Sequence, residues 1–267
     1  MTTQSLEERL TEAVRQNDEL RKAAEEYRAQ LRIAEKGREH ALQTARLANE
    51  EVQHFIYAMG HDLRAALRNV VTHSQLLQRQ QAQNPETKDF VKVILEGASE
   101  MNGFIEDVLA FSRAGAASTR THIDLGVIVK LQLMNLDKEI KESGAVISFE
   151  NLPEAEVNES DLGKVFFQLF RNAMRYRNAE PPRIEVTSEE KSDAFLISVR
   201  DNGVGIRPDY HKQVFAPFKR LHGKEVPGRG LGLAMARKII RAHGGEIWVE
   251  SDGQHGSVFR FTLPYQP

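Results

Sequence analysis

Two glycine-rich stretches decide how this chain folds: Asp201-Asn-Gly-Val-Gly205 and, further on, Gly228-Arg-Gly-Leu-Gly232. Glycine reaches backbone conformations with positive φ and lets the main chain approach a ligand, because it has no Cβ. Successive N–H groups in such turns form concavities that bind anions such as phosphate. An ionised carboxylate such as that of Asp201 only accepts hydrogen bonds, which suits the exocyclic amine of adenine. Together the two stretches predict a nucleotide site.

A histidine and a carboxylate stand side by side far upstream, in Gly60-His-Asp-Leu63. Neutral imidazole is nucleophilic near physiological pH, and its two nitrogens can take different roles. Asp62 can accept a proton or a hydrogen bond from one nitrogen of His61 and leave the other to attack a phosphate. Taken alone, His61 is better explained as a helix-surface histidine, like His54 and His73. A nucleotide site in the same chain favours the phospho-acceptor interpretation.

Composition narrows the class of protein. With 267 residues the chain has room for two folded units and an accessory helix. The net charge of −2 argues against a nucleic-acid partner. The absence of cysteine excludes disulfides, a thiol nucleophile and cysteine-ligated zinc. No apolar run approaches the ~20 residues that span a bilayer, and the N-terminus lacks a signal-peptide core, so we expect a cytoplasmic protein without a membrane span.

Residues 1–52 are predicted to form a coiled-coil signalling helix, because apolar residues recur at alternating steps of three and four. A solvated single helix remains the alternative. Asn17 and Arg38 fall on the seam, where polar residues set register at a cost in stability. The heptad itself covers residues 5–59 and runs on into the next segment; its seam positions are Leu6, Leu10, Ala13, Asn17, Leu20, Ala24, Tyr27, Leu31, Ala34, Arg38, Ala41, Ala45, Ala48, Val52, Phe55 and Met59.

Residues 53–120 are predicted to form a helical hairpin, with a turn over Gln80–Lys88 and a linker over Arg113–Thr121. The two amphipathic stretches have more apolar surface than one hairpin can bury. Dimerisation into a four-helix bundle solves that problem, so we expect a homodimer.

Residues 121–267 alternate strand-like and helical patterns, which predicts a two-layer α/β sandwich and an α+β multidomain chain. Strands are expected at Ala145–Glu150, Arg183–Ser188, Phe195–Asp201, Glu246–Glu250 and Ser257–Leu263. Helices are expected at Leu125–Ser143, Ser160–Arg177 and Leu231–His243.

Several motifs in register resemble the core of sensor histidine kinases, specifically the type linked to phytochrome-like receptors. They are the H-box Gly60–Leu63, the N-box Gln168–Ala173, the G1 box Asp201–Ile206, the F-box Val214–His222, the G2 box Gly228–Leu233, and the closing stretches Gly244–Ser251 and Gly256–Pro264. The resemblance covers roughly residues 53–265. It implies the ATP-binding fold that this class shares with gyrase and Hsp90-type ATPases.

The resemblance also implies roles for individual residues. It makes His61 the phospho-acceptor with Asp62 beside it, and ATP and Mg²⁺ the cofactors. Asn172 matches the magnesium-ligating asparagine, and Gln168, where the family more often has asparagine, is a further candidate ligand. The implied ATP-binding residues are Asn172, Arg175, Asp201, Gly203, Gly205, Lys219, Arg220, Gly228, Gly230, Leu231 and Gly232.

The segment between Phe215 and Gly228 matches the ATP lid, and Lys219, Arg220, His222 and Lys224 make it basic. For Tyr176 and Arg177, pocket lining, core packing and solvent exposure remain equally open.

The H-box departs from the family pattern at Ala65-Ala66, where a polar or acidic residue and then proline are common. Without the proline, the helix should run straight past His61. Without a polar side chain at position 65, that turn has no group to orient a water, so we expect little phosphatase activity.

The predicted function is therefore autophosphorylation of His61 from ATP, followed by transfer to an aspartate on the receiver domain of a separate response regulator. A nucleotide-binding dimeric scaffold without kinase activity is the alternative. An ATPase machine of the gyrase or Hsp90 kind would leave the His-Asp hairpin unexplained. No sensor domain precedes the heptads, so we expect the signal to come from a separate sensor protein or from an N-terminal domain missing from this sequence.

Overall fold

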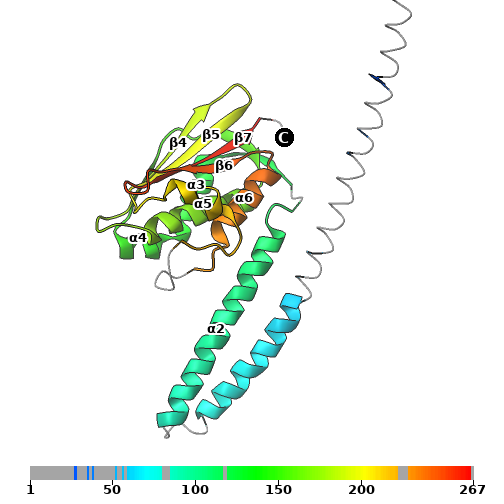
Figure 1. Cartoon of the computed structure of the whole chain (residues 1–267), viewed down its shortest axis with the longest axis vertical. Helices are drawn as coiled ribbons and strands as arrows, with labels where there is room; N and C mark the ends of the chain where they lie inside the picture. The colour runs from blue at the N-terminus through cyan, green and yellow to red at the C-terminus, as the bar shows by residue number, and fades with distance from the viewer. Residues whose placement is uncertain are drawn as a thin grey trace, which may run out of the picture. The chain divides into compact units, whose positions relative to one another are not determined.

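The structure is a computed structural model that describes residues 59–79, 85–116, 119–221 and 228–265, with isolated helical positions at 27, 28, 35, 38, 52 and 56. The chain divides into two compact units, Met1–Phe55 and Ile56–Pro267. The predicted coiled coil over residues 1–52 falls almost wholly outside the described residues. The second unit contains a helical hairpin and an α/β domain (Figure 1).

The hairpin consists of a helix over residues 59–79 and of α2 (Pro85–Arg113). Its small core is formed by Leu67, Ala98, Ile105 and Leu109. The predicted turn over Gln80–Lys88 is wrong at its end, since α2 already begins at Pro85. Proline is favoured at the first position of a helix, where its missing N–H would have no intrahelical partner. The helix that carries His61 is continuous past Ala65 and Ala66, as the missing proline predicts.

A broad apolar surface remains exposed on the hairpin. Its large exposed side chains are Met59, Leu63, Val70, Leu76, Leu77, Phe90, Val93 and Ile94, whereas Met101 and Phe104 are exposed where α2 faces the α/β domain. Exposed apolar side chains in this concentration on one hairpin indicate an interaction surface. In the described part of the chain, no helix is long and apolar enough to cross a membrane.

The α/β domain is built on a five-stranded sheet with the strand order β2-β4-β5-β7-β6. All five strands were predicted, and each agrees within two residues. Their bounds are β2 Val146–Phe149, β4 Arg183–Glu190, β5 Ala194–Asp201, β6 Ile247–Glu250 and β7 Ser257–Pro264. Only β2 and β4 are parallel. Helices cover one face of the sheet and make the two-layer sandwich (Figure 1).

The covering helices are α3 (Leu125–Asn135), α4 (Asp137–Ser143), α5 (Glu159–Arg175) and α6 (Gly232–Ala242). The single helix predicted over Leu125–Ser143 is wrong, because the chain turns at Leu136, whose side chain is fully buried in the core. Helix α5 ends two residues earlier than predicted, at Arg175. Two single-turn 3-10 helices, η1 (Pro208–Tyr210) and η2 (Gln213–Phe215), precede α6.

A second, two-stranded sheet was not predicted. It pairs β1 (Thr121–Asp124) with β3 (Glu154–Val157) in antiparallel register. Asp124 then caps α3, because its Oδ1 accepts a 2.7 Å hydrogen bond from the N–H of Gly126.

We predict that Phe261→Ala lowers the free energy of unfolding by about 3–5 kcal/mol, the usual cost of removing a buried aromatic ring. Phe261 of β7 is fully buried, and its ring lies 5.8 Å from that of Phe166 on α5, so it joins the sheet to the helix layer. Urea unfolding measures the effect. The control Arg200→Ala, at an exposed side chain of β5, should change the stability by less than about 0.5 kcal/mol.

Candidate functional site

Asp201 is the last residue of β5 and lies opposite Ser257 of β7. Its Oδ1 accepts two hydrogen bonds, from the N–H of Gly203 at 2.8 Å and from the N–H of Ser257 at 3.2 Å. Burial raises the pKa of Asp201, and the two backbone donors partly oppose that shift. Both hydrogen bonds use the same oxygen, so the carboxylate is held by Oδ1 and can present Oδ2 to a ligand.

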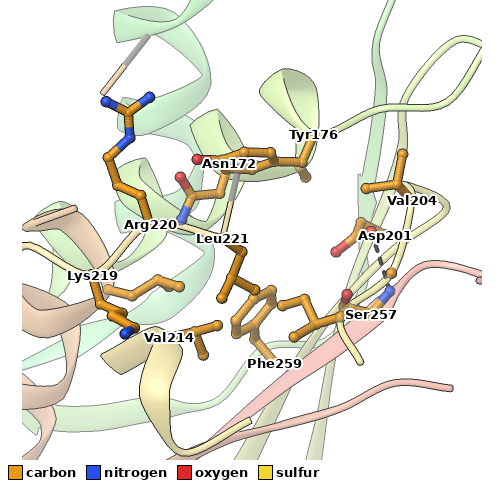
Figure 2. A pocket seen from close by; sticks show the side chains of 14 residues that line it. Asn172, Tyr176, Asp201, Val204, Val214, Lys219, Arg220, Leu221, Ser257 and Phe259 are labelled. Atoms are coloured by element: carbon orange, nitrogen blue, oxygen red, sulfur yellow. Dashed lines mark hydrogen bonds between the residues drawn. The ribbon is translucent and has the colours of Figure 1, made fainter. Parts of the chain in front are cut away.

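A pocket opens in front of this carboxylate, and we call it the inner pocket. Figure 2 shows Asp201 on one side and Asn172 on the other, with Val214 and Phe259 beneath them. The lining is mainly apolar apart from Asp201, Asn172 and the two cations of the lid segment. Its residues are Asn172, Ala173, Tyr176, Asp201, Val204, Gly205, Ile206, Val214, Lys219, Arg220, Leu221, Leu233, Ser257 and Phe259. An apolar slot with one acceptor suits a flat heterocycle that carries an amine.

A larger groove continues from the inner pocket, and we call it the outer groove. The two share Asn172, Tyr176, Lys219, Arg220 and Leu233. The outer groove gathers five cationic side chains, Arg171, Arg175, Lys219, Arg220 and Arg229, and of these Arg229 is paired with Asp107 of α2. Its opposite wall is α2, which contributes Phe104 and Asp107 among others. Such a concentration of positive charge suits a polyanion.

The electrostatics of Arg175 indicate the same ligand. Burial lowers the pKa of Arg175, and repulsion from Arg171 and then Arg220 adds to the effect, whereas Tyr176 opposes it. The negative charge of a bound phosphate would offset this repulsion. Guanidinium groups also bind phosphate oxygens with two parallel hydrogen bonds.

The glycines of residues 228–232 form the floor of the outer groove. Gly230 has a φ of +73°, and a Cβ there would come within 2.7 Å of the Lys219 carbonyl oxygen, so only glycine fits. Helix α6 begins directly afterwards, and no side chain caps its N-terminus. Its first N–H groups therefore remain available to an anion in the groove.

Two amides on α5 are candidate magnesium ligands. Asn172 lies where the inner pocket meets the outer groove, and Gln168 lines the groove one turn earlier. The Gln168 side-chain oxygen packs against Gly232, in the space that a Cβ there would need. The described residues contain no group of three or more His, Cys, Asp or Glu side chains that could hold a metal. Amide oxygens with ligand phosphates fit Mg²⁺, which keeps several waters and is bound by few protein groups.

The structure brings most of the predicted site residues together. Asp201, Gly205 and Asn172 line the inner pocket, Lys219 and Arg220 line both spaces, and Gly203 supports Asp201. Arg175, Gly228, Gly230, Leu231 and Gly232 line the outer groove. His222 and Lys224 lie outside the described residues. Tyr176 lines the pocket, whereas Arg177 donates to the Ser143 carbonyl and does not line either space.

His61 and Asp62 lie on the hairpin and line neither the inner pocket nor the outer groove. Both side chains are exposed, and His61 Nδ1 lies 3.3 Å from Asp62 Oδ1.

Several lining residues were not predicted. Arg171 precedes Arg175 by one helical turn, a spacing that could have indicated it. The partners of Arg229, which are Asp107 and the Glu100 carbonyl of α2, could not be predicted because they are far from Arg229 in the sequence. The remaining residues of the inner pocket that were not predicted to bind ATP are apolar or small: Ala173, Val204, Ile206, Val214, Leu221, Leu233, Ser257 and Phe259.

Two protein-family models match the chain. Residues 51–117 match the His Kinase A (phospho-acceptor) domain. Residues 157–267 match the histidine kinase-, DNA gyrase B- and HSP90-like ATPase domain. The matches follow the hairpin and the larger part of the α/β domain.

Among curated proteins, the chain is similar to cyanobacterial phytochrome A of Nostoc sp., with 38% identity over 221 residues that cover 81% of this chain and 29% of the relative. It is similar to the phytochrome-like protein Cph1 of Synechocystis sp., with 34% identity over 81% of this chain and 30% of the relative. The chain thus spans less than a third of the length of these phytochromes.

Two solved structures have the same fold. Full-length ShkA in complex with AMPPNP superposes with a TM-score of 0.63 at 24% identity, over 79% of this chain and 45% of that one. Histidine kinase ThkA in complex with the response regulator TrrA gives a TM-score of 0.54 at 23% identity, over 82% and 64%.

We predict that Asp201→Asn weakens ATP binding by about 1.5–3 kcal/mol, the usual range for a hydrogen bond to a charged group. Titration calorimetry measures this. The same variant should be at least as stable as the wild type at neutral pH, since Asn keeps an oxygen for the two backbone donors.

The pH dependence of stability provides a second test of Asp201. Its pKa is raised in the folded state, so ionisation costs stability as the pH rises above the ordinary value of 3.8. The stability gain of Asp201→Asn should therefore shrink below that pH, where the carboxyl group is protonated in both states. A variant that is destabilised at pH 7 and still binds ATP normally would make Asp201 a structural residue.

Proposed function

The chain carries the phospho-acceptor and ATP-binding domains of a sensor histidine kinase, and from this we propose that it is an ATP-dependent kinase that phosphorylates its own His61. We assign residues 53–120 to the dimerisation and phosphotransfer hairpin and residues 121–267 to the catalytic domain. The pairing of β1 with β3, which starts at Thr121, supports this boundary. Residues 1–52 would form the signalling helix.

The chemistry at His61 depends on how its two ring nitrogens are used. With the proton on Nδ1, the ring donates to Asp62 Oδ1, 3.3 Å away, and the lone pair of Nε2 is the nucleophile. The Nε2–P bond forms as the bond between the γ-phosphorus and the bridging oxygen breaks, and ADP leaves. Asp62 stabilises the positive charge that develops on the imidazole and can accept its proton.

The nucleotide would lie with adenine in the inner pocket, its exocyclic amine on Asp201, and with its phosphates among the cations of the outer groove. Asn172 would hold Mg²⁺, with Gln168 beside it, and the ion would supply charge neutralisation on the phosphate oxygens. Arg175, Lys219, Arg220 and the N-terminus of α6 would bind phosphate directly.

The main support for this proposal is that an apolar pocket with a single carboxylate, Asp201, opens directly into a strongly cationic groove. Neither a core cavity nor a protein-docking groove requires both. The dimeric scaffold without kinase activity remains the alternative, and it differs only in leaving His61 unphosphorylated.

The proposed partners are a second copy of the chain and a response regulator. The exposed apolar surface of the hairpin supports a four-helix bundle in a homodimer. The ThkA structure contains the response regulator TrrA, which supports transfer from His61 to a receiver aspartate here.

We predict that His61→Gln abolishes labelling by γ-labelled ATP and Mg²⁺ and leaves ATP affinity unchanged, because His61 does not line the nucleotide site. His73→Gln is the matched control. His73 lies on the same helix, where its Nδ1 contacts the Asn69 carbonyl, and its replacement should keep the label. An acid-labile, base-stable label that persists in His61→Gln would move the acceptor elsewhere, and a wild type that binds ATP without labelling would favour the scaffold.

We also predict little dephosphorylation of a phospho-regulator by the wild-type chain, because Ala65 has no polar group one turn after His61. Ala65→Thr should increase the rate, since a hydroxyl there can orient a water, and should keep autophosphorylation. Loss of label from purified phospho-regulator in the presence of ADP is the measurement. Rapid dephosphorylation by the wild type would contradict this account of Ala65.

A further inference from the structure

One face of α2 packs around the side chain of Arg229. Glu100, Gly103, Phe104 and Asp107 follow the i, i+3, i+4, i+7 spacing of a single helical face. Arg229 Nη1 lies 2.8 Å from Asp107 Oδ2, and its Nη2 donates to the Glu100 carbonyl oxygen at 3.1 Å. The guanidinium occupies the space that a Cβ on Gly103 would need. A glycine inside a long helix costs stability, and here it makes room for the arginine.

The same face of α2 also contacts Phe218, whose backbone is hydrogen-bonded to Gly230. The rings of Phe104 and Phe218 have centroids 5.8 Å apart. Phe218 has a φ of +61°, which is strained for a residue with a side chain, and its N–H donates to the Gly230 carbonyl oxygen. The ion pair therefore holds the segment of Arg229 against α2, and the ring contact holds the segment of Phe218. These two segments meet at Gly230.

A separate anchor ties α2 to α6. Lys238 Nζ donates to the carbonyl oxygens of Phe111 and Ser112, at 3.0 and 2.7 Å, where the last turn of α2 has no intrahelical donors left. Burial lowers the pKa of Lys238, and Asp161 partly restores it. One anchor fixes a point and permits rotation about it, whereas the second anchor at Arg229 also fixes the direction of α2.

The level of this contact along the hairpin coincides with His61. A Cβ on Gly60 would touch the side chain of Leu109, and Arg64 Nη1 lies 3.1 Å from Glu106 Oε1. The helical turn that begins at Gly60 therefore lies opposite residues 106–109 of α2. Asp107 belongs to that segment, so Arg229 meets the hairpin at the level of the phospho-acceptor.

We propose that the Arg229–Asp107 contact, with Gly103 and Phe104 beside it, is a register contact. It positions the phosphate-binding side of the catalytic domain along the hairpin, at the level of His61. The inference rests on the proposed kinase function. Arg229 is a positioning residue: it acts on the rate of phosphoryl transfer through α2 and contributes little to ATP affinity. Its side chain is 35% exposed and that of Asp107 is 44% exposed, so salt should weaken the contact.

The test compares Arg229→Ala with Gly103→Ala. The second variant improves the helix propensity of α2 and crowds the guanidinium, so a loss of folding would not explain its effect. Gly97→Ala is the matched control on the same helix, because a Cβ there meets no atom within 4 Å. We expect both test variants to label His61 about tenfold more slowly at saturating ATP, the scale of a misplaced reacting group, with ATP affinity unchanged. Arg229→Lys, which keeps the charge, should recover part of the rate.

Three results would overturn the proposal: a loss of ATP affinity in Arg229→Ala, which would make Arg229 a phosphate ligand; faster labelling, which would make the contact a brake; and equal rates in Gly103→Ala and Gly97→Ala.

A second readout does not depend on kinase activity, so it separates failure of this proposal from failure of the proposed function. The chain has no cysteine, so the double variant Phe104→Cys/Phe218→Cys carries only the two introduced thiols. A short bismaleimide should crosslink them within one chain, and adding Arg229→Ala or high salt should reduce the yield several-fold. No crosslink with Arg229 intact, or a yield that does not depend on Arg229, would overturn the register contact even if His61 is phosphorylated.

Discussion

The arrangement of the catalytic domain depends on how the Asp201 carboxylate is held. Burial makes its charge costly, and two backbone donors, from Gly203 and Ser257, offset part of that cost by hydrogen bonds to one oxygen. The second donor is in place only because β5 and β7 pair with Asp201 opposite Ser257. Strand β7 also carries Phe261, which packs against Phe166 of α5, and α5 presents Asn172 across the pocket. Strand register, core packing and the two polar walls of the site therefore depend on one another.

Much of this could be predicted from the sequence because the relevant signals are local. Period-two alternation indicated the five strands of the main sheet, and the glycines around Gly203 and Gly230 indicated the turns that need them. The sequence failed where a tertiary contact decides. Leu136 interrupts a helical pattern because its side chain enters the core, and β1 and β3 are four-residue strands that are defined only by each other. The apolar pocket walls, such as Phe259 and Leu233, look like any core residue in the sequence.

The connection between hairpin and catalytic domain was the least predictable part. Lys238 and Arg229 read as surface cations, yet one caps the end of α2 and the other pairs with Asp107. Asp161, which is buried, accepts from the linker N–H of Gly115 and pairs with Lys164, so the linker is tied to α5 as well. Arg229 lies between Gly228 and Gly230, so the segment that lines the outer groove is also the segment that contacts α2. These contacts give a physical route by which a change in the hairpin can reach the proposed phosphate site.

The most direct measurement is a crystal structure of the chain with a non-hydrolysable ATP analogue and Mg²⁺. We expect the adenine in the inner pocket, its exocyclic amine within hydrogen-bond distance of Asp201, and its phosphates among Arg175, Lys219 and the N-terminus of α6. A nucleotide bound elsewhere, or an adenine that leaves Asp201 facing water, would contradict this expectation.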